Sequence, residues 1–161
     1  MDTYKRAYRK IGNQGLFDSE ERTSMLNALG NPLERLSETI DFEMFRETLE
    51  MGLYRERLTN AGAKPYDYVL MFKILVLQRM YNLSDEQTEY QIVDRTSFRN
   101  FLGLASGDRV PDARTIWTFK EQLTEKNLYD KLFADFDKFL REKNLIMYLQ
   151  LSVVCRGYEC Q

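Results

Sequence analysis

The sequence of 161 residues contains no histidine. Histidine is the usual general base at neutral pH and the commonest metal ligand, and the chain also has no glycine-rich phosphate loop. Ser97 and Ser106 have no base partner that would activate them as nucleophiles. We therefore expect no catalytic residue, no metal site, no cofactor and no small-molecule substrate.

Cysteine is scarce, since the chain has only Cys155 and Cys160, both near the C-terminus. Without histidine they cannot complete a tetrahedral zinc site, and they are typical of a reduced, cytoplasmic protein. The charged N-terminus is not followed by the apolar run of a signal peptide. The most apolar segment, Tyr68 to Leu77, is interrupted by Lys73 and is too short to span a bilayer, so we expect no membrane partner.

Glycine and proline are also few, with 8 and 3 residues, which disfavours a β fold with many tight turns. Hydrophobic residues make up 43% of the chain, enough for a real core. Helical spacing relates Phe42, Phe45, Leu49 and Leu53, and the segment from Asp67 to Tyr81 is apolar on nearly every side, as in a central helix. We predict an all-α, compact bundle of six or seven helices.

Composition divides the chain into three parts. Residues 1–18 form a basic and aromatic arm, residues 19–146 a helical domain, and residues 147–161 a C-terminal tail. The arm alternates tyrosines with four basic residues that suit a nucleic-acid backbone: Lys5, Arg6, Arg9 and Lys10. Packing of these tyrosines on the domain is the alternative.

The segment from Leu83 to Leu123 predicts a helix-turn-helix-like DNA-binding unit. Ser84 and Gln87 form a capping box for one helix, a short helix follows over residues 97–102, and Asp112 caps a third helix after a loop. Helices joined in this way are how many small domains present one helix to DNA. The loop is longer than the usual tight turn.

The third helix has a predicted buried face, with Trp117 flanking it: Ile116, Phe119 and Leu123. Its opposite face carries residue types that reach bases or phosphates from a helix in the major groove: Arg114, Thr115, Thr118 and Gln122. The start of this helix also offers backbone N–H groups and a positive dipole end to a phosphate.

The net charge is -2, so any DNA site must be a local basic patch. Between Arg95 and Lys120 there are five basic residues and two acidic ones. Three arginines of this stretch would position the chain on phosphates: Arg95, Arg99 and Arg109. The alternative is a solvated helix whose arginines pair with Asp94, Asp108 and Asp112. The acidic helices between Ser19 and Leu53 cannot lie on phosphates and are either solvated or a partner surface.

Two stretches, LSDEQTEYQIVDRTSFRNFLGL and VPDARTIWTFKEQL, resemble the N-terminal helical domain of bacterial DDE-type transposases of the insertion-sequence-five group. The most specific piece comprises Pro111, Asp112, Thr115, Ile116, Trp117 and Phe119. The resemblance implies binding of double-stranded DNA at the terminal inverted repeats of an insertion sequence. In such enzymes a ribonuclease-H-like domain follows, whose Asp, Asp and Glu hold divalent metal.

The tail departs from that family. Residues 148–161 contain no aspartate, so no catalytic residue can be carried over. A frameshifted or early-ended reading frame would produce such a tail. We predict a DNA-binding front end that is inactive as an enzyme by itself. The alternatives are a dimerisation module that pairs with another copy or inhibits full-length transposase, and an inert remnant.

Overall fold

The computed structural model describes residues 18–28, 30–53, 65–105, 107–143 and 145. This part of the chain is all-α, as predicted, but it contains eight α-helices where six or seven were expected. No described helix is long and apolar enough to cross a membrane. Its elements in chain order are α1 (Asp18–Ala28), α2 (Pro32–Thr39), the 3-10 helix η1 (Phe42–Phe45), α3 (Arg46–Leu53), α4 (Tyr68–Tyr81), α5 (Asp85–Asp94), α6 (Thr96–Leu102), α7 (Ala113–Glu125) and α8 (Tyr129–Glu142).

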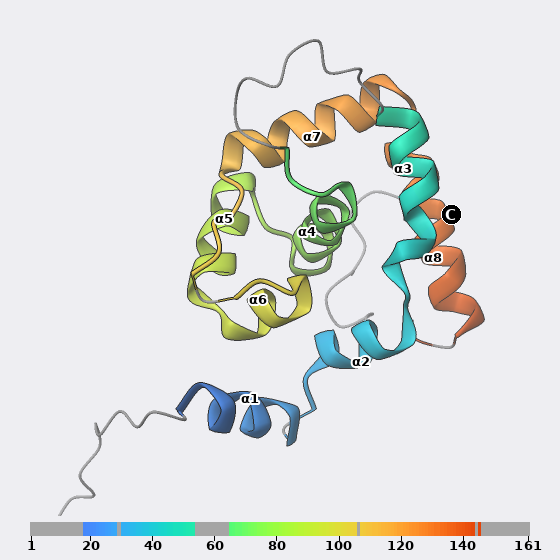
Figure 1. Cartoon of the computed structure of the whole chain (residues 1–161). Coiled ribbons are helices and arrows are strands. Elements are labelled where there is room, and N and C mark those ends of the chain that lie inside the picture. The colour runs from blue at the N-terminus through green and yellow to red at the C-terminus, as the bar shows by residue number, and fades with distance from the viewer. Residues whose placement is uncertain (1–17, 29, 54–64, 106, 144, 146–161) are drawn as a thin grey trace, which may run out of the picture.

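Helix α4 lies at the centre of the bundle, surrounded by α3, α5, α6, α7 and α8 (Figure 1). Nine of its 14 residues are buried. Asp67 begins the helix, because its carboxylate accepts hydrogen bonds from the N–H groups of Val69 and Leu70 at 2.9 and 3.1 Å. The central position predicted for this apolar segment is confirmed.

Phenylalanine rings join α4 to the elements on either side. The Phe72 ring lies 4.9 Å from Phe45 and 6.4 Å from Phe42 of η1, and 5.5 Å from Phe133 and 6.3 Å from Phe136 of α8, between ring centroids. These are tilted or edge-on geometries that aromatic pairs prefer. The cluster therefore ties η1, α4 and α8 into one core.

The segment before α4 differs in detail from its predicted helix. The first turn, Phe42–Phe45, is a 3-10 helix that Asp41 caps through the N–H of Glu43 at 3.0 Å. Tight turns of this kind are frequent where helices begin. The four apolar residues of the predicted stripe are nevertheless all buried. Helix α2 starts at Pro32, whose fixed φ suits the first turn of a helix.

Helices α5, α6 and α7 correspond to the predicted three-helix segment. The capping box of Ser84 and Gln87 is present, with N–H to side-chain distances of 3.0 and 3.2 Å. Helix α5 packs against both α6 and α7, and the loop after α6 runs back along α5 to the start of α7 (Figure 1). Helix α7 packs mainly on α5 and α4. A standard helix-turn-helix instead consists of two helices joined by a tight turn.

Candidate functional site on helix α7

Helix α7 is fixed in the bundle by its apolar back. Ile116 and Leu123 are fully buried and Phe119 is 5% exposed, which confirms the predicted buried face. Trp117, predicted to flank this face, is 51% exposed. Because the back is held by core packing, the opposite face is presented to solvent in a fixed orientation.

The first turn of α7 is occupied by carboxylates. The Asp112 side chain accepts a hydrogen bond from the Thr115 N–H at 2.7 Å, and the Glu89 carboxylate of α5 accepts one from the Ala113 N–H at 2.8 Å. Hydrogen bonds from the hydroxyl and N–H of Thr115 hold the pKa of Asp112 below its ordinary value. Two N–H groups of this helix start therefore already bind carboxylates, and the binding of a phosphate there stays a prediction.

Four of the predicted DNA-contacting residues lie together. Arg114, Thr115, Thr118 and Gln122 line one side of an open groove with a volume of about 410 Å³. Their spacing along α7 places them on the same helical face. The opposite wall comes from the segment before α4 and its first residues: Pro65, Tyr66, Tyr68 and Met71.

The tyrosine wall was not predicted, because nothing in the sequence links Tyr66 and Tyr68 to α7. Tyr68 is held in place by its hydroxyl, which donates to the Leu53 carbonyl at 3.2 Å, and by its ring, which stacks on Phe119 at 6.3 Å. Tyr66 is half-buried and has no hydrogen bond to another described residue. In the sequence these two tyrosines appear only as aromatic residues near Pro65.

The remaining predicted arginines lie outside the groove. The Arg99 guanidinium donates to the backbone carbonyls of Ala105 and Asp108, so this side chain organises the loop between α6 and α7. Arg95 lies over the rings of Tyr81 and Phe98, at 5.9 and 5.2 Å from their centroids. Both side chains thus make contacts within the fold. No described arginine forms the ion pairs with Asp94, Asp108 or Asp112 that the alternative interpretation expected. Arg109 is exposed in the loop before α7.

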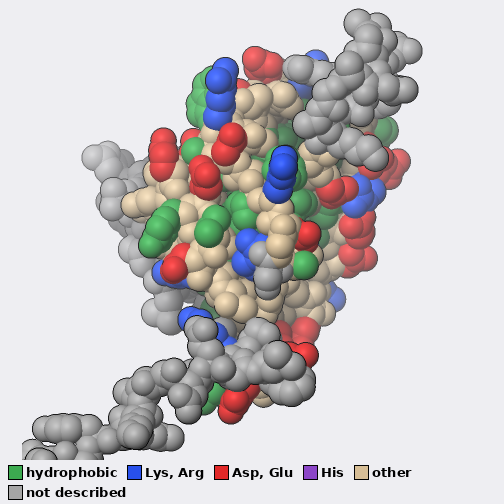
Figure 2. Space-filling view, turned by 60° about the vertical axis from the view of Figure 1, so that its left-hand side comes forward, with side chains coloured by type: hydrophobic (Ala, Val, Ile, Leu, Met, Phe, Trp, Pro, Cys, Tyr) green, Lys and Arg blue, Asp and Glu red, His purple; other side chains and the backbone are tan. Residues whose placement is uncertain are grey.

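Lys120 does not contribute to an exposed basic patch. Its ammonium lies 2.5 Å from the Asp85 carboxylate, which also accepts a hydrogen bond from the Gln78 amide at 2.6 Å. Figure 2 shows that blue, red and green side chains are intermingled over the face turned toward the viewer. The local basic excess of the sequence is therefore not a continuous ridge on this face.

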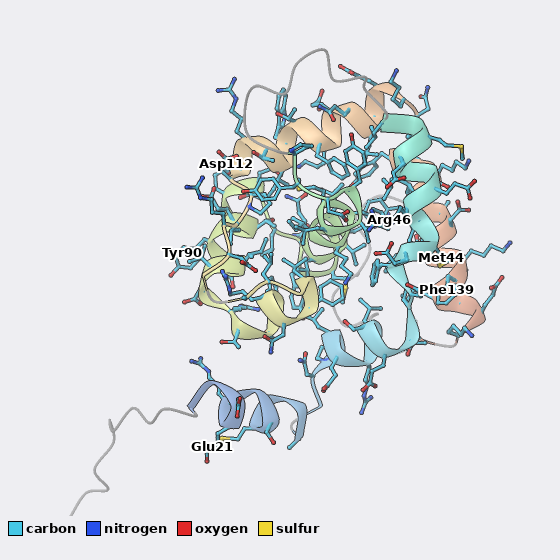
Figure 3. All side chains as sticks on the ribbon, in the orientation of Figure 1. Glu21, Met44, Arg46, Tyr90, Asp112 and Phe139 are labelled. Atoms are coloured by element: carbon cyan, nitrogen blue, oxygen red, sulfur yellow. The ribbon has the colours of Figure 1, made fainter. Side chains whose placement is uncertain are left out.

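The acidic segment η1–α3 forms its own ion-pair network. The Arg46 guanidinium contacts the carboxylates of Glu43, Glu50 and Asp67, with distances of 3.3 Å to Glu50 and 2.8 Å to Asp67. Figure 3 shows Arg46 between α3 and α4, where it makes these contacts. The same view shows two residues away from the network: Asp112 at the start of α7, and Tyr90 on the outer side of α5, pointing away from the bundle. The network connects α3 with the start of α4.

Two predicted regions lie outside the described residues. These are the arm, with Lys5, Arg6, Arg9 and Lys10, and the tail from residue 147. Among the described residues, no group of three His, Cys, Asp or Glu side chains is placed to hold a metal ion.

The sequence of the chain matches a known protein family. A family model described as a transposase domain (DUF772) matches residues 20–122. The match begins in α1 and ends within α7, so it includes all the described groove residues. No solved structure matches the chain. The family model names a transposase domain, and the finer assignment to DDE enzymes of the insertion-sequence-five group stays a prediction.

Proposed function

Because the chain belongs to the DUF772 transposase domain family, we propose that it binds double-stranded DNA through the exposed face of α7. The observation that carries this proposal is the grouping of Arg114, Thr115, Thr118 and Gln122 on one face whose back is fixed in the core. A fixed helix of this kind holds its polar side chains in register with a ligand, which lowers the entropic cost of binding.

The charged residues of this region support contacts to phosphates at the edge of the face. Arg109 and Arg114 are exposed, and neither guanidinium has a hydrogen bond or ion pair to another described side chain. Arg95 is also exposed, although it lies on aromatic rings. Arg99 acts on the loop that carries Arg109, so we assign it a positioning role rather than a direct contact.

The proposed site is the terminal inverted repeat of an insertion sequence, as the resemblance of VPDARTIWTFKEQL implies. A labelled duplex carrying the repeat of the element that encodes this chain is compared with a scrambled duplex of the same composition. The repeat should bind at least about tenfold more tightly, since each mismatched base pair costs roughly 1–3 kcal/mol. Equal affinity would contradict recognition of the repeat. With Mg²⁺ present we expect binding without cutting, which denaturing electrophoresis of the duplex checks.

The decisive variant is Arg114→Ala, measured by fluorescence anisotropy across a salt series. If Arg114 contacts a phosphate, the slope of log affinity against log salt should fall by about 1. Arg141→Ala is the matched control, because Arg141 is exposed on α8 and takes no part in the groove. Unchanged slope and affinity for Arg114→Ala would overturn the assignment of α7 as the DNA-binding helix.

The second candidate function is self-association, and exposed methionines favour it. Met44 is 51% and Met51 is 71% exposed on the acidic segment η1–α3. Met44 lies in the 3-10 helix η1 and Met51 in α3, and the segment that carries both is rich in glutamate. Unbranched methionines adapt well to a partner surface. The partner would be a second copy of the chain or a full-length transposase.

Sedimentation velocity, with and without duplex, tests this second candidate. Met51→Lys should shift a dimer toward monomer, while Val93→Lys on α5, also at an exposed apolar residue of 61%, should not. A chain that sediments as a monomer at all concentrations would remove self-association through this face.

A further inference from the structure

We propose that the groove beside α7 takes a single unpaired nucleobase, so that this helix reads a base that has left the duplex. The inference rests on the proposed DNA-binding function and adds the chemical class of the group bound. It depends on the shape of the groove, the aromatic wall opposite α7, and the balance of charges at its edges.

The surroundings of α7 differ from those of a helix that reads the major groove of DNA. Direct readout requires a helix that stands clear of its neighbours, because it must enter a channel about 12 Å wide. The polar face of α7 instead forms one wall of a hollow whose other wall contains Tyr66 and Tyr68. A base rotated out of the stack can lie between these two walls, beside Thr118 and Gln122, while the rest of the duplex stays outside on the exposed face of α7.

The aromatic wall supplies a stacking surface. Tyr68 is fixed by its hydrogen bond to Leu53 and by Phe119, so its ring is a rigid part of the wall. Tyr66 lines the groove beside it and is half-buried. Nucleobases stack on such rings with little dependence on sequence, because every base has a π face.

The charges of the groove favour a neutral group over a phosphate. Arg114 and Asp112 both line the groove, so the charge of the guanidinium there is offset by that of a carboxylate. A phosphate inside the groove would meet that negative charge. A base is neutral and carries both donors and acceptors on its edge, while its own phosphate can remain outside the groove.

The hydrogen-bonding groups fit the edge of a base. The Thr118 hydroxyl donates to the Arg114 carbonyl at 2.8 Å, so its free lone pairs can accept from the ligand. The Gln122 side chain has no hydrogen bond to another described residue and offers both a donor and an acceptor. A volume of about 410 Å³ lies at the lower end of the range for small-ligand pockets.

The test compares three duplexes of identical flanking sequence: fully paired, with one bulged adenine, and with one bulged abasic nucleotide. Anisotropy should give an affinity for the bulged adenine roughly fivefold or more above that for the other two. The abasic bulge controls for bending and local melting, which a bulge causes whether or not a base is present.

The variants then place the base in the groove. Tyr66→Leu should bring the ratio of bulged-adenine to paired affinity close to one, while Tyr66→Phe should keep it, since only the ring is needed. Arg141→Ala should leave the ratio unchanged. With 2-aminopurine at the bulge, stacking on Tyr66 should quench the fluorescence in the wild type and not in Tyr66→Leu.

The possible failures are distinguishable. Equal affinity for the adenine and abasic bulges, with paired duplex still bound, overturns the base pocket and leaves the proposed function in place. No binding of any of the three duplexes overturns both. If Tyr66→Leu unfolds, which circular dichroism detects, the Tyr66→Phe variant and the quenching measured on the wild type still decide the question.

Discussion

Helices α4 and α7 have almost the same length, 14 and 13 residues, and each begins at an aspartate cap, but they use their surfaces differently. Helix α4 buries nine residues and α7 only three, Ile116, Phe119 and Leu123. On α4 nearly every side chain is required by packing. On α7 packing explains one face, so the residue types of the other face are available for binding.

The two aspartate caps show the same division. The carboxylate of Asp67 both caps α4 and contacts Arg46 of α3, so it holds two elements together. The carboxylate of Asp112 caps α7 and lies at the edge of the groove. One cap therefore serves the fold alone, while the other also sets the electrostatics of a candidate site.

The largest expected effect is that of Phe72→Ala in α4. Phe72 is fully buried and its ring contacts four other phenylalanines, so truncation removes the centre of the core. We expect a loss of about 3–5 kcal/mol in the free energy of unfolding, measured by urea denaturation. Trp117→Ala on α7 is the control and should cost far less, because half of Trp117 is already exposed. Similar losses for both variants would remove the contrast between the helices.

A smaller effect is expected at the back of α7. Ile116 is fully buried, so Ile116→Val should cost about 0.5–1.5 kcal/mol of unfolding free energy. DNA affinity at a temperature where the variant stays folded should not change, because Ile116 does not line the groove. A change in affinity without a change in stability would show that the back of α7 also takes part in binding.

The sequence predicted the helices well because their signals are local. The apolar run of α4, the capping box of Ser84 and Gln87, and the cap at Asp112 each act within a few residues of the chain. The buried stripe from Phe42 to Leu53 was equally readable from its spacing, even though its first turn is 3-10.

The candidate site was predicted only in part, because its other half depends on tertiary packing. The four α7 residues share a helical face and could be grouped from spacing alone. Tyr66 and Tyr68 lie far away in sequence, and only the packing of α4 against α7 brings them to the groove. Similarly, the sequence counts Lys120 and Arg99 as basic surface, whereas Asp85 pairs with the first and loop carbonyls bind the second.

The pH dependence of stability should separate the two caps. Burial raises the pKa of Asp67, but hydrogen bonds from Arg46 and from the N–H groups of Leu70 and Val69 outweigh it, so the pKa is lowered from 3.8. A carboxyl group whose pKa is depressed by folding stabilises the protein above its unfolded value, and this contribution disappears as pH falls through the folded pKa.

Asp67→Asn keeps a capping side chain but removes the charge. Its unfolding free energy at pH 7 should be lower than that of the wild type by less than about 1 kcal/mol, since the pair with Arg46 is largely exposed. The difference should shrink as pH falls below about 4. Asp112→Asn, which breaks no ion pair to a described residue, should show a smaller difference at pH 7 in the same urea titrations. A difference for Asp67→Asn that persists unchanged to pH 2 would mean that the charge is not responsible.

The smallest expected effect on stability is that of Thr118→Ala on the open face of α7. Thr118 is exposed and its hydroxyl bonds back to the Arg114 carbonyl, an arrangement that adds little to a helix, while alanine has the higher helix propensity. The free energy of unfolding should stay within about 0.5 kcal/mol of the wild type. DNA affinity should nevertheless fall, since Thr118 lines the groove. Gln78→Ala on α4 should behave in the opposite way, because the Gln78 amide is buried and bonded to Asp85. If Thr118→Ala lowers the free energy of unfolding and keeps DNA affinity, the open face of α7 contributes to stability and not to binding. The proposed difference between α4 and α7 would then be wrong.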